Sequence, residues 1–273
     1  MYHRGYNMKT KTTGDLSSAE SRLAYMQSPK NRRNMMLYEE GCWRFIAPLL
    51  PAHSIRILEA GCGTGRWVNR LAPLGHRMVL SDISPDMIRT AMAQIEKQGI
   101  SKQVDGCHVL DICNMDQLPD ESFDMALALG EPIGLCDDPH KGIGELARVV
   151  KPGGYVACDV ANRYRNALDL ARENNWQGAA EALKSGRIQT STGFPRRCFS
   201  PNELCEFYDA YGLRVLHLAA VCPLLSFPPD DSQSAAMEND ATYSAAMDIF
   251  HQFAQTPEML GVSTRLLIVG QKP

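Results

Sequence analysis

Short apolar runs alternate with stretches of helical spacing along the chain from residue 54 onward. Apolar runs of about six residues between turn residues are typical of buried strands, and apolar residues at i, i+3, i+4 and i+7 are typical of helices. The pattern predicts strands at 55–60, 77–82, 106–111, 123–129, 155–161, 213–219 and 263–270. Strands that alternate with helices favour βαβ units, so we expect a mostly parallel sheet and an α/β fold.

Two helix starts are clearly marked. Ser84-Pro85-Asp86 combines an N-cap serine, a proline at the first helical position and an acid in the first turn. Residues 200–203 have the spacing of a capping box. The apolar faces of these helices are Met87, Ile88, Ala91, Met92 and Ile95 in the first, and Leu204, Phe207, Tyr208 and Tyr211 in the second. Two more helices are predicted at 66–74 and 143–150, and the Lys-Pro-Gly-Gly run that follows ends the latter.

Three segments of the chain lie outside the predicted alternation of strands and helices that forms this sheet. Residues 1–50 are interpreted as an N-terminal leader and capping helices, with a break at Ser28-Pro29. Residues 51–273 form one domain with insertions at about 162–199 and 222–262. Long segments outside the sheet are often lids or binding loops, so we expect these insertions to cap the domain.

Composition and charge exclude several classes of protein. Hydrophobic residues make up 44% of the 273 residues, and 28 basic against 31 acidic residues exclude a strongly basic protein that coats duplex nucleic acid. The longest apolar stretch, at 213–227, contains Arg214, His217 and Pro223 and falls short of a membrane span. The N-terminus lacks an apolar signal region, and the nine cysteines include no C-x-x-C pair. We expect a cytoplasmic protein with reduced thiols and no metal site.

The strongest local signal is a glycine-rich turn between a predicted strand and a helix, Glu59-Ala60-Gly61-Cys62-Gly63-Thr64-Gly65. Glycines at such a turn let the backbone approach a ligand closely. A dinucleotide site would have the spacing G-x-G-x-x-G, but here the spacing is G-x-G-x-G and Arg66 takes the place of the third glycine. No lysine followed by serine or threonine comes after the turn, so a nucleoside triphosphate site is not favoured either.

Three acids lie at the carboxyl ends of three predicted strands: Glu59, Asp82 and Asp111. Open α/β sheets bind ligands at the carboxyl ends of their strands, so these side chains are expected at one edge. A carboxylate at Asp82 can accept hydrogen bonds from ribose hydroxyls, and one at Asp111 can accept from an adenine amine. The negative charge of Glu59 suits a ligand that carries an ammonium or sulfonium group.

These motifs in order resemble a class I S-adenosylmethionine (SAM) dependent methyltransferase of the ubiquinone or small-molecule type. The matching runs are Glu59-x-Gly61-Cys62-Gly63-Thr64-Gly65, Asp82-Ile83-Ser84, Asp111-Ile112-x6-Pro119, Phe123-Asp124-x4-Leu129-Gly130 and Arg148-Val149-x-Lys151-Pro152-Gly153-Gly154. The resemblance is strong over residues 40–161 and weaker beyond them. It implies a Rossmann-like, seven-stranded, mostly parallel sheet with an antiparallel last strand, helices on both faces and a helical cap.

The resemblance also assigns cofactor residues. They are Glu59, Gly61, Cys62, Gly63, Gly65, Leu129 and Gly130 around the loop and the methionine part of SAM, Asp82 at the ribose, and Ile83, Met87, Asp111 and Ile112 around the adenine. Cys62 is expected in the loop because a small residue is needed there, and not as a nucleophile.

Candidates for the acceptor side follow the fourth and fifth strands. Glu131 is interpreted as a general base or a substrate ligand, with a solvated or capping acid as the alternative. Basic residues near the same edge indicate an anionic substrate group such as a carboxylate or phosphate, unless they are solvated surface. The substrate-binding candidates are Arg163, Tyr164, Arg165 and Arg197, with Arg196 in the same cluster; Tyr25, Arg33 and Tyr38 on the N-terminal helices are further candidates.

We therefore expect a SAM-dependent methyltransferase that acts on an O, N or C nucleophile of a small, anionic molecule. Three alternatives remain open at this stage: methylation of a modified tRNA nucleoside, a non-catalytic SAM-binding regulatory protein, and an oxidoreductase with a nucleotide cofactor. The substrate, the acceptor atom, the use of a general base and the oligomeric state do not follow from the sequence.

Overall fold

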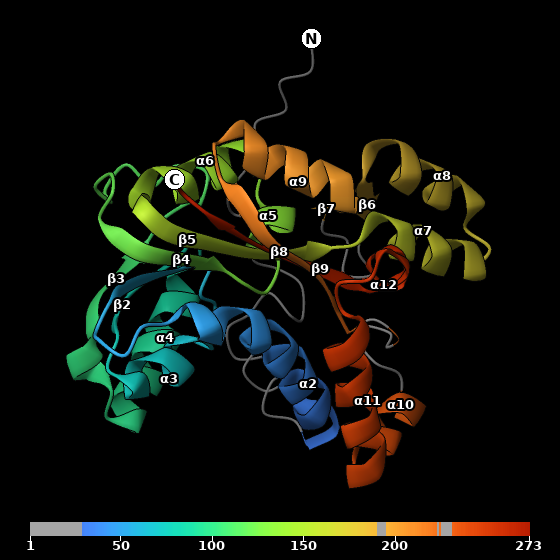
Figure 1. The fold of residues 1–273 in the computed structure, drawn as a ribbon, viewed down its shortest axis with the longest axis horizontal. Coiled ribbons are helices and arrows are strands. Elements are labelled where there is room, and N and C mark those ends of the chain that lie inside the picture. Colours follow the sequence, from blue (N-terminus) through green and yellow to red (C-terminus); the bar gives the residue numbers. More distant parts are fainter. Residues whose placement is uncertain (1–28, 190–194, 223, 225–230) are drawn as a thin grey trace.

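The computed structural model describes residues 29–189, 195–222, 224 and 231–273. In this part of the chain seven strands form one sheet in the order β3-β2-β1-β4-β5-β9-β8 (Figure 1). The strands are β1 (Arg56–Ala60), β2 (Arg77–Asp82), β3 (Val104–Val109), β4 (Phe123–Ala128), β5 (Val150–Ala161), β8 (Arg214–Val221) and β9 (Arg265–Gln271). The first five are parallel, whereas β9 is antiparallel to both of its neighbours, β5 and β8. The predicted Rossmann-like sheet is confirmed.

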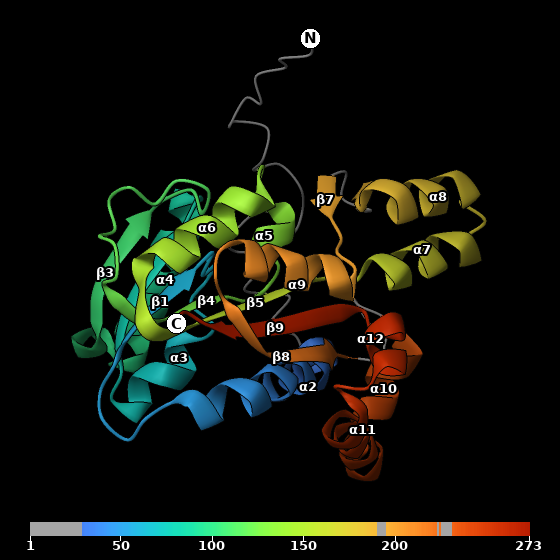
Figure 2. The same cartoon turned by 45° about the horizontal axis from the view of Figure 1, so that its top comes forward.

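Helices cover both faces of the sheet (Figures 1 and 2). One face packs against α2 (Pro29–Ile46), α3 (Val68–Leu71), α4 (Pro85–Gln98) and α11 (Asp240–Phe253), and the other against α5 (Pro132–Leu135), α6 (Pro139–Val149) and α9 (Pro201–Ala210). Successive strand residues point to opposite faces, so Ile57 joins the first core cluster and Leu58 the second.

The two predicted helix starts are confirmed. The Ser84 hydroxyl accepts a hydrogen bond from the Met87 N–H at 3.4 Å at the start of α4, and Ser200 and Glu203 form the capping box of α9. The apolar face predicted for α4 was wrong in one member, because Met92 is 46% exposed. Successive residues of a helix are rotated by about 100°, which places Met92 at the outer edge of the apolar stripe of α4, outside the part that packs against the sheet.

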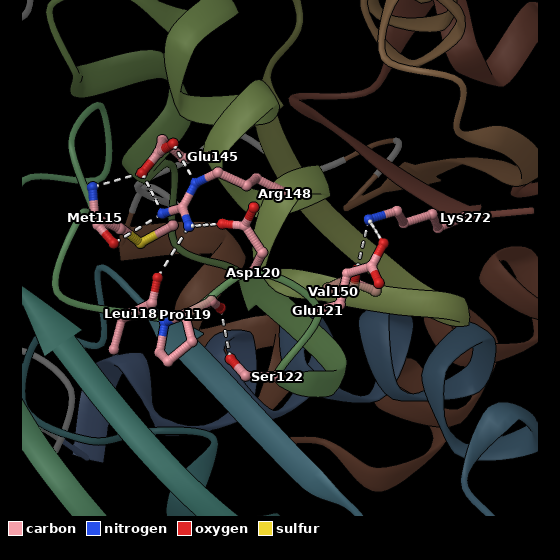
Figure 3. Close-up of polar contacts among 10 residues, drawn as sticks. All are labelled: Met115, Leu118, Pro119, Asp120, Glu121, Ser122, Glu145, Arg148, Val150 and Lys272. Carbon is pink, nitrogen blue, oxygen red and sulfur yellow. Dashed lines mark hydrogen bonds and ion pairs between the residues drawn. The ribbon is translucent and has the colours of Figure 1, made fainter.

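Arg148 begins the predicted motif at residues 148–154 and lies in α6. Its hydrogen bonds connect α6 to the loop that follows Asp111 (Figure 3). Its Nη2 donates to the Met115 carbonyl at 2.8 Å, and its Nη1 donates to the Leu118 carbonyl at 2.9 Å. Glu145 completes the contact by accepting from Arg148 Nε at 2.7 Å and from the Met115 N–H at 2.6 Å. This arginine therefore stabilises the loop between β3 and β4.

The first insertion contains a helical hairpin and a small sheet. Helices α7 (Arg163–Arg172) and α8 (Trp176–Ser185) pack through a small alanine-rich cluster, and β6 (Arg187–Gln189) pairs with β7 (Pro195–Arg197) (Figure 1). These two strands were not predicted, because each has only three residues and at most one apolar side chain besides proline, too few to show an apolar alternation.

The second insertion contains α10 (Asp231–Met237), α11 and α12 (Pro257–Val262). Helices α10 and α11 lie beside α2, where Asn34 Nδ2 donates to the Ser234 hydroxyl at 3.2 Å and Arg33 pairs with Asp240 at 2.7 Å. The described helices include none that is long and apolar enough to cross a membrane. Residues 1–28, with Tyr25, lie outside the described residues, so the division at residue 50 stays a prediction.

Candidate functional site

The glycine-rich turn leaves β1 with its backbone in the left-handed region. Gly61, Gly63 and Gly65 have φ angles of 67°, 56° and 82°, which side-chain-bearing residues rarely adopt. A Cβ atom on Gly61 would stand 2.4 Å from the Cβ of Pro132, the first residue of α5. The turn therefore packs closely against the segment that follows β4, and only glycine fits at position 61.

Asp82 joins the end of β2 to this turn. Its Oδ2 accepts a hydrogen bond from the Gly63 N–H at 2.8 Å, and its Oδ1 accepts from the Ser84 N–H at 2.9 Å. In the loop after β3, Asp111 Oδ1 accepts from the Cys113 N–H at 2.9 Å. Both acids thus lie at the carboxyl edge of the sheet, as the sequence indicated.

Glu59 lies beneath the turn, fully enclosed by protein. Its two carboxylate oxygens accept from the N–H groups of Trp67, at 3.1 Å, and of Val68, at 2.9 Å, which begin the short helix α3. Burial raises the pKa of Glu59 to about 7, against the opposing effect of these hydrogen bonds and of Arg66. The carboxylate therefore caps α3, a role that was not predicted, and its placement beside the methionine part of SAM stays a prediction.

The apolar cofactor candidates differ in burial. Met87 and Ile112 are buried, whereas Ile83 is largely exposed. Cys62 is buried in the first core cluster, and burial raises the pKa of its thiol well above the ordinary value. A neutral, enclosed thiol fits the expectation that this position needs only a small residue.

The residues at this edge fit SAM. Asp82 at the end of β2 and Asp111 in the loop after β3 provide carboxylate acceptors, and Glu59 is buried under the glycine-rich turn. The glycines leave the backbone of this turn open to a ligand that side chains would keep away. At the end of β4, a Cβ on Gly130 would meet no described atom within 4 Å, so the backbone is open there.

The turn after β4 is fixed from below by Asp159 of β5. Asp159 Oδ1 accepts hydrogen bonds from the N–H groups of Gly130 and Glu131, and its Oδ2 pairs with Arg265 at the start of β9. Glu131 itself has a φ of 72°, an uncommon value for a residue with a side chain. A buried anion therefore holds a strained backbone position.

Glu131 is 5% exposed, and its two carboxylate oxygens have different partners. Oε2 lies 2.9 Å from Arg265 Nη2 and 3.6 Å from Arg196 Nη2, whereas Oε1 has no hydrogen-bond partner among the described residues. Burial alone would lower the pKa of Arg265, but the charges of Asp159 and Glu131 raise it. Arg265 is thus a cation held between two acids.

A cavity opens beside Glu131. Its lining comes from the residue before α5, from α7 and β7, and from the start of β9, and consists of Glu131, Arg165, Asn166, Asp169, Arg196, Thr264 and Arg265. Among the predicted substrate residues, Arg165 lies here, with its Nε 2.9 Å from both oxygens of Asp169.

The other predicted substrate residues lie elsewhere. Arg163 and Arg197 both pair with Glu203 on α9, and Tyr164 is 47% exposed on α7. The structure therefore groups the arginines differently from the prediction: Arg165 is joined by Arg196 and Arg265. Arg265 was missed, although a charged residue in an otherwise apolar closing strand was a usable signal.

Tyr38 of helix α2 lies near both the glycine-rich turn and the cavity beside Glu131. The buried ring of Tyr38 lies 5.3 Å from the guanidinium carbon of Arg265 and 5.2 Å from that of Arg66, which follows the glycine-rich turn. Arg33 of the same helix faces α11 through Asp240 and not the cavity. Within the described residues, no group of three His, Cys, Asp or Glu side chains is arranged to hold a metal ion.

Comparison with known proteins agrees with this geometry. A family profile described as a methyltransferase domain matches residues 57–154, from β1 to the first part of β5. The ubiquinone biosynthesis O-methyltransferase of Maricaulis maris is 33% identical over 123 residues, 44% of this chain and 46% of the relative. The malonyl-[acyl-carrier protein] O-methyltransferase of Pectobacterium atrosepticum is 32% identical over 174 residues, 60% and 64% of the two chains. The alignments thus span about half to two thirds of these relatives.

One similarity extends over nearly the whole chain. The tRNA 5-carboxymethoxyuridine methyltransferase of Escherichia coli K12 is 26% identical over 280 aligned positions, 97% of this chain and 98% of the relative. Among solved structures, a SAM-dependent methyltransferase from Methanosarcina mazei has a TM-score of 0.61 at 19% identity, covering 84% of this chain and 96% of that one. The ordered motifs, the sheet topology and these similarities give one result: residues 57–154 match a methyltransferase domain, and the chain has the fold of SAM-dependent methyltransferases.

Proposed function

We propose that the protein transfers the methyl group of SAM to an anionic acceptor bound in the cavity beside Glu131. The observation that carries this proposal is the convergence of Arg165, Arg196 and Arg265, from three separate elements, on a cavity next to the turn after β4. Guanidinium groups bind carboxylates and phosphates bidentately, which fixes orientation as well as affinity.

The chain's own residues would hold and align the two reactants. The glycine-rich turn, Asp82 and Asp111 would hold the cofactor, and the arginines of the cavity would hold the acceptor. SAM supplies a methyl carbon that is already activated by the positive sulfonium, so alignment and exclusion of water are the main contributions left to the protein. The enclosed position of Glu131 and Arg265 suits that role.

A small anionic molecule and a modified tRNA nucleoside are both candidate acceptors. The small molecule is favoured by the arginine-lined cavity, and it was the expectation from the sequence. The tRNA nucleoside is favoured by a similarity that covers 97% of the chain, including the insertion that supplies Arg165 and Arg196. The name of that relative places a carboxyl group on the nucleoside, so the acceptor is an anion whether it is a small molecule or a tRNA nucleoside.

Methyl-labelled SAM distinguishes the candidates. The protein is incubated with labelled SAM and either a low-molecular-weight metabolite extract or total tRNA, and the labelled product is separated and digested with nuclease. Label in a product whose unmethylated acceptor is an anionic small molecule or a nucleoside with an acidic group supports the proposal. Label only in products of neutral or cationic acceptors contradicts it, and SAM binding with no transfer to either fraction favours the non-catalytic alternative.

A further inference from the structure

We infer that the acceptor is a carboxylate that also carries an O–H or N–H donor, that Glu131 binds this donor through Oε1, and that the product is a methyl ester. The inference rests on the proposed function. It adds the chemical class of the acceptor and replaces the role of general base considered for Glu131 with that of a ligand for the acceptor.

The first observation is the uneven use of the Glu131 carboxylate. Glu131 lines the cavity; its Oε2 faces the guanidinium groups of Arg265 and Arg196, whereas its Oε1 is buried and has no partner among the described residues. A buried charged oxygen without a donor is costly, so such an atom in a cavity is matched to a donor on the ligand. The strained φ of Glu131 also indicates a position that is held for function.

The second observation concerns proton transfer. The side chains of Glu131 and Arg265 are 7% and 8% exposed, and Arg196 relies on the same Glu131 oxygen. A proton on Glu131 would remove the anion that faces both guanidiniums, and removal of one partner from a buried ion pair is strongly unfavourable. Glu131 is therefore suited to accept a hydrogen bond and not to take up a proton.

The third observation selects the anion. Arg265 is held between Asp159 and Glu131, and Arg165 is held by Asp169. Arg196 is less committed: its contact to Glu131 is 3.6 Å, longer than a hydrogen bond, and its buried Nε has no partner among the described residues. One available guanidinium matches the single charge of a carboxylate better than the two charges of a phosphate monoester.

These assignments give a balanced step without a base. A carboxylate oxygen of the acceptor attacks the methyl carbon, the C–O bond forms as the C–S bond breaks, and the electron pair of the broken bond stays on sulfur. The acceptor loses its negative charge, the sulfonium loses its positive charge, and no proton is released. Because Arg196 and Glu131 are neighbours, the carboxylate and the donor are expected within a few bonds of each other.

Matched probe pairs test the inference. Malonamate and 3-hydroxypropanoate carry a carboxylate and a donor, whereas monomethyl malonate and 3-methoxypropanoate keep the carboxylate but lack the donor. Binding of each to the protein saturated with S-adenosylhomocysteine is measured by calorimetry. The wild type should bind the donor-bearing member of each pair roughly ten-fold more tightly, because the other member leaves Glu131 Oε1 unpaired.

Variants assign the preference to residues. Glu131→Met should abolish the preference, and Glu131→Gln, which keeps an acceptor oxygen, should retain a reduced one. Arg196→Gln should weaken all four probes about equally, whereas Arg187→Gln, an exposed arginine on the neighbouring strand β6, should change none. Unchanged affinity for S-adenosylhomocysteine shows that each variant is folded.

The outcomes separate the inference from the proposed function. Equal binding within each pair, or a product methylated on the donor atom, overturns the inference, while the proposed function stands if Arg196→Gln still weakens the carboxylates. Failure of every carboxylate to bind, together with transfer to a neutral acceptor, overturns both. Methyl esters detected by mass spectrometry, formed at saturating SAM at a rate that does not rise with pH between about 6 and 9, support the inference.

Discussion

Asp159 supports Glu131 from two directions at once. Its Oδ1 accepts a hydrogen bond from the Glu131 N–H at 3.2 Å, and its Oδ2 pairs with Arg265, which in turn lies 2.9 Å from the Glu131 carboxylate. Backbone and side chain of Glu131 are therefore fixed by one buried acid. This closed set of contacts joins β4, β5 and β9 at the edge of the sheet where the cavity opens.

Asp159→Ala is expected to lower the free energy of unfolding by about 3–5 kcal/mol, because it breaks the buried ion pair between Asp159 and Arg265, which then keeps its ion pair with Glu131. Urea unfolding measures this change. Asp169→Ala, which removes a half-exposed partner of Arg165 on α7, is the control and should cost less than about 1 kcal/mol. Equal losses in the two variants would contradict the role assigned to Asp159.

Asp82→Ala should weaken SAM binding roughly 10- to 150-fold, since hydrogen bonds to a charged group contribute about 1.5–3 kcal/mol. The substitution also removes the acceptor for the Gly63 and Ser84 N–H groups and thus loosens the turn. Calorimetry with SAM gives the affinity. Asp86→Ala, at an exposed position of α4, should leave it unchanged. Normal SAM affinity in a folded Asp82→Ala protein would show that the ribose is placed wrongly.

Gly63→Val should abolish SAM binding while most of the fold is kept. A β-branched side chain does not fit a φ of 56°, and it would occupy the face of the turn assigned to the cofactor. The matched control is Gly75→Val, because Gly75 has a φ of 91° and open space around it. Both variants should lose stability, but only the first should lose SAM binding in equilibrium dialysis.

SAM affinity should rise with pH through about 7. Burial raises the pKa of Glu59 from 4.5 to about 7, so the folded protein takes up a proton that the unfolded chain does not, and the free energy of unfolding falls as pH rises from about 4.5 to 7. The positive charge of SAM favours the ionised form of Glu59, and binding should therefore release a proton near pH 7. Calorimetry in buffers of different ionisation enthalpy detects this proton, and Glu59→Gln should remove it.

Arg165→Gln and Arg196→Gln should each reduce kcat/KM for the true acceptor about ten-fold or more, with SAM affinity unchanged. Arg163→Gln should leave kcat/KM nearly unchanged, because its guanidinium pairs with Glu203 and does not line the cavity. Steady-state kinetics with the acceptor identified by labelling provides the measurement. A larger loss for Arg163→Gln than for Arg196→Gln would restore the grouping expected from the sequence.

The features that were predicted correctly depend on neighbours in the sequence. All seven sheet strands follow from short apolar runs, and the Ser84 and Ser200 caps follow from four-residue signals. The positions of Asp82 and Asp111 at one edge follow from the rule for parallel strands.

The features that were missed depend on distant contacts. Asp159 and Arg265 are 106 residues apart, and no local pattern indicates that β9 returns beside β5. Arg163 and Arg165 are two residues apart on α7, so they point to opposite sides of the helix, and only one reaches the cavity. Their adjacency in the sequence suggested one function for both.

Because β9 runs in the reversed direction, the residues assigned to SAM and those assigned to the acceptor come from different stretches of the chain. A parallel strand brings its last residues to the ligand edge, but β9 brings its first, so Arg265 stands opposite Ala161, the end of β5. The residues assigned to SAM all precede position 131, whereas Arg165, Arg196 and Arg265 come later. Acceptor preference can therefore diverge among descendants of one ancestral enzyme, or be redesigned in the laboratory, through changes in the second half alone, while the cofactor half is inherited intact.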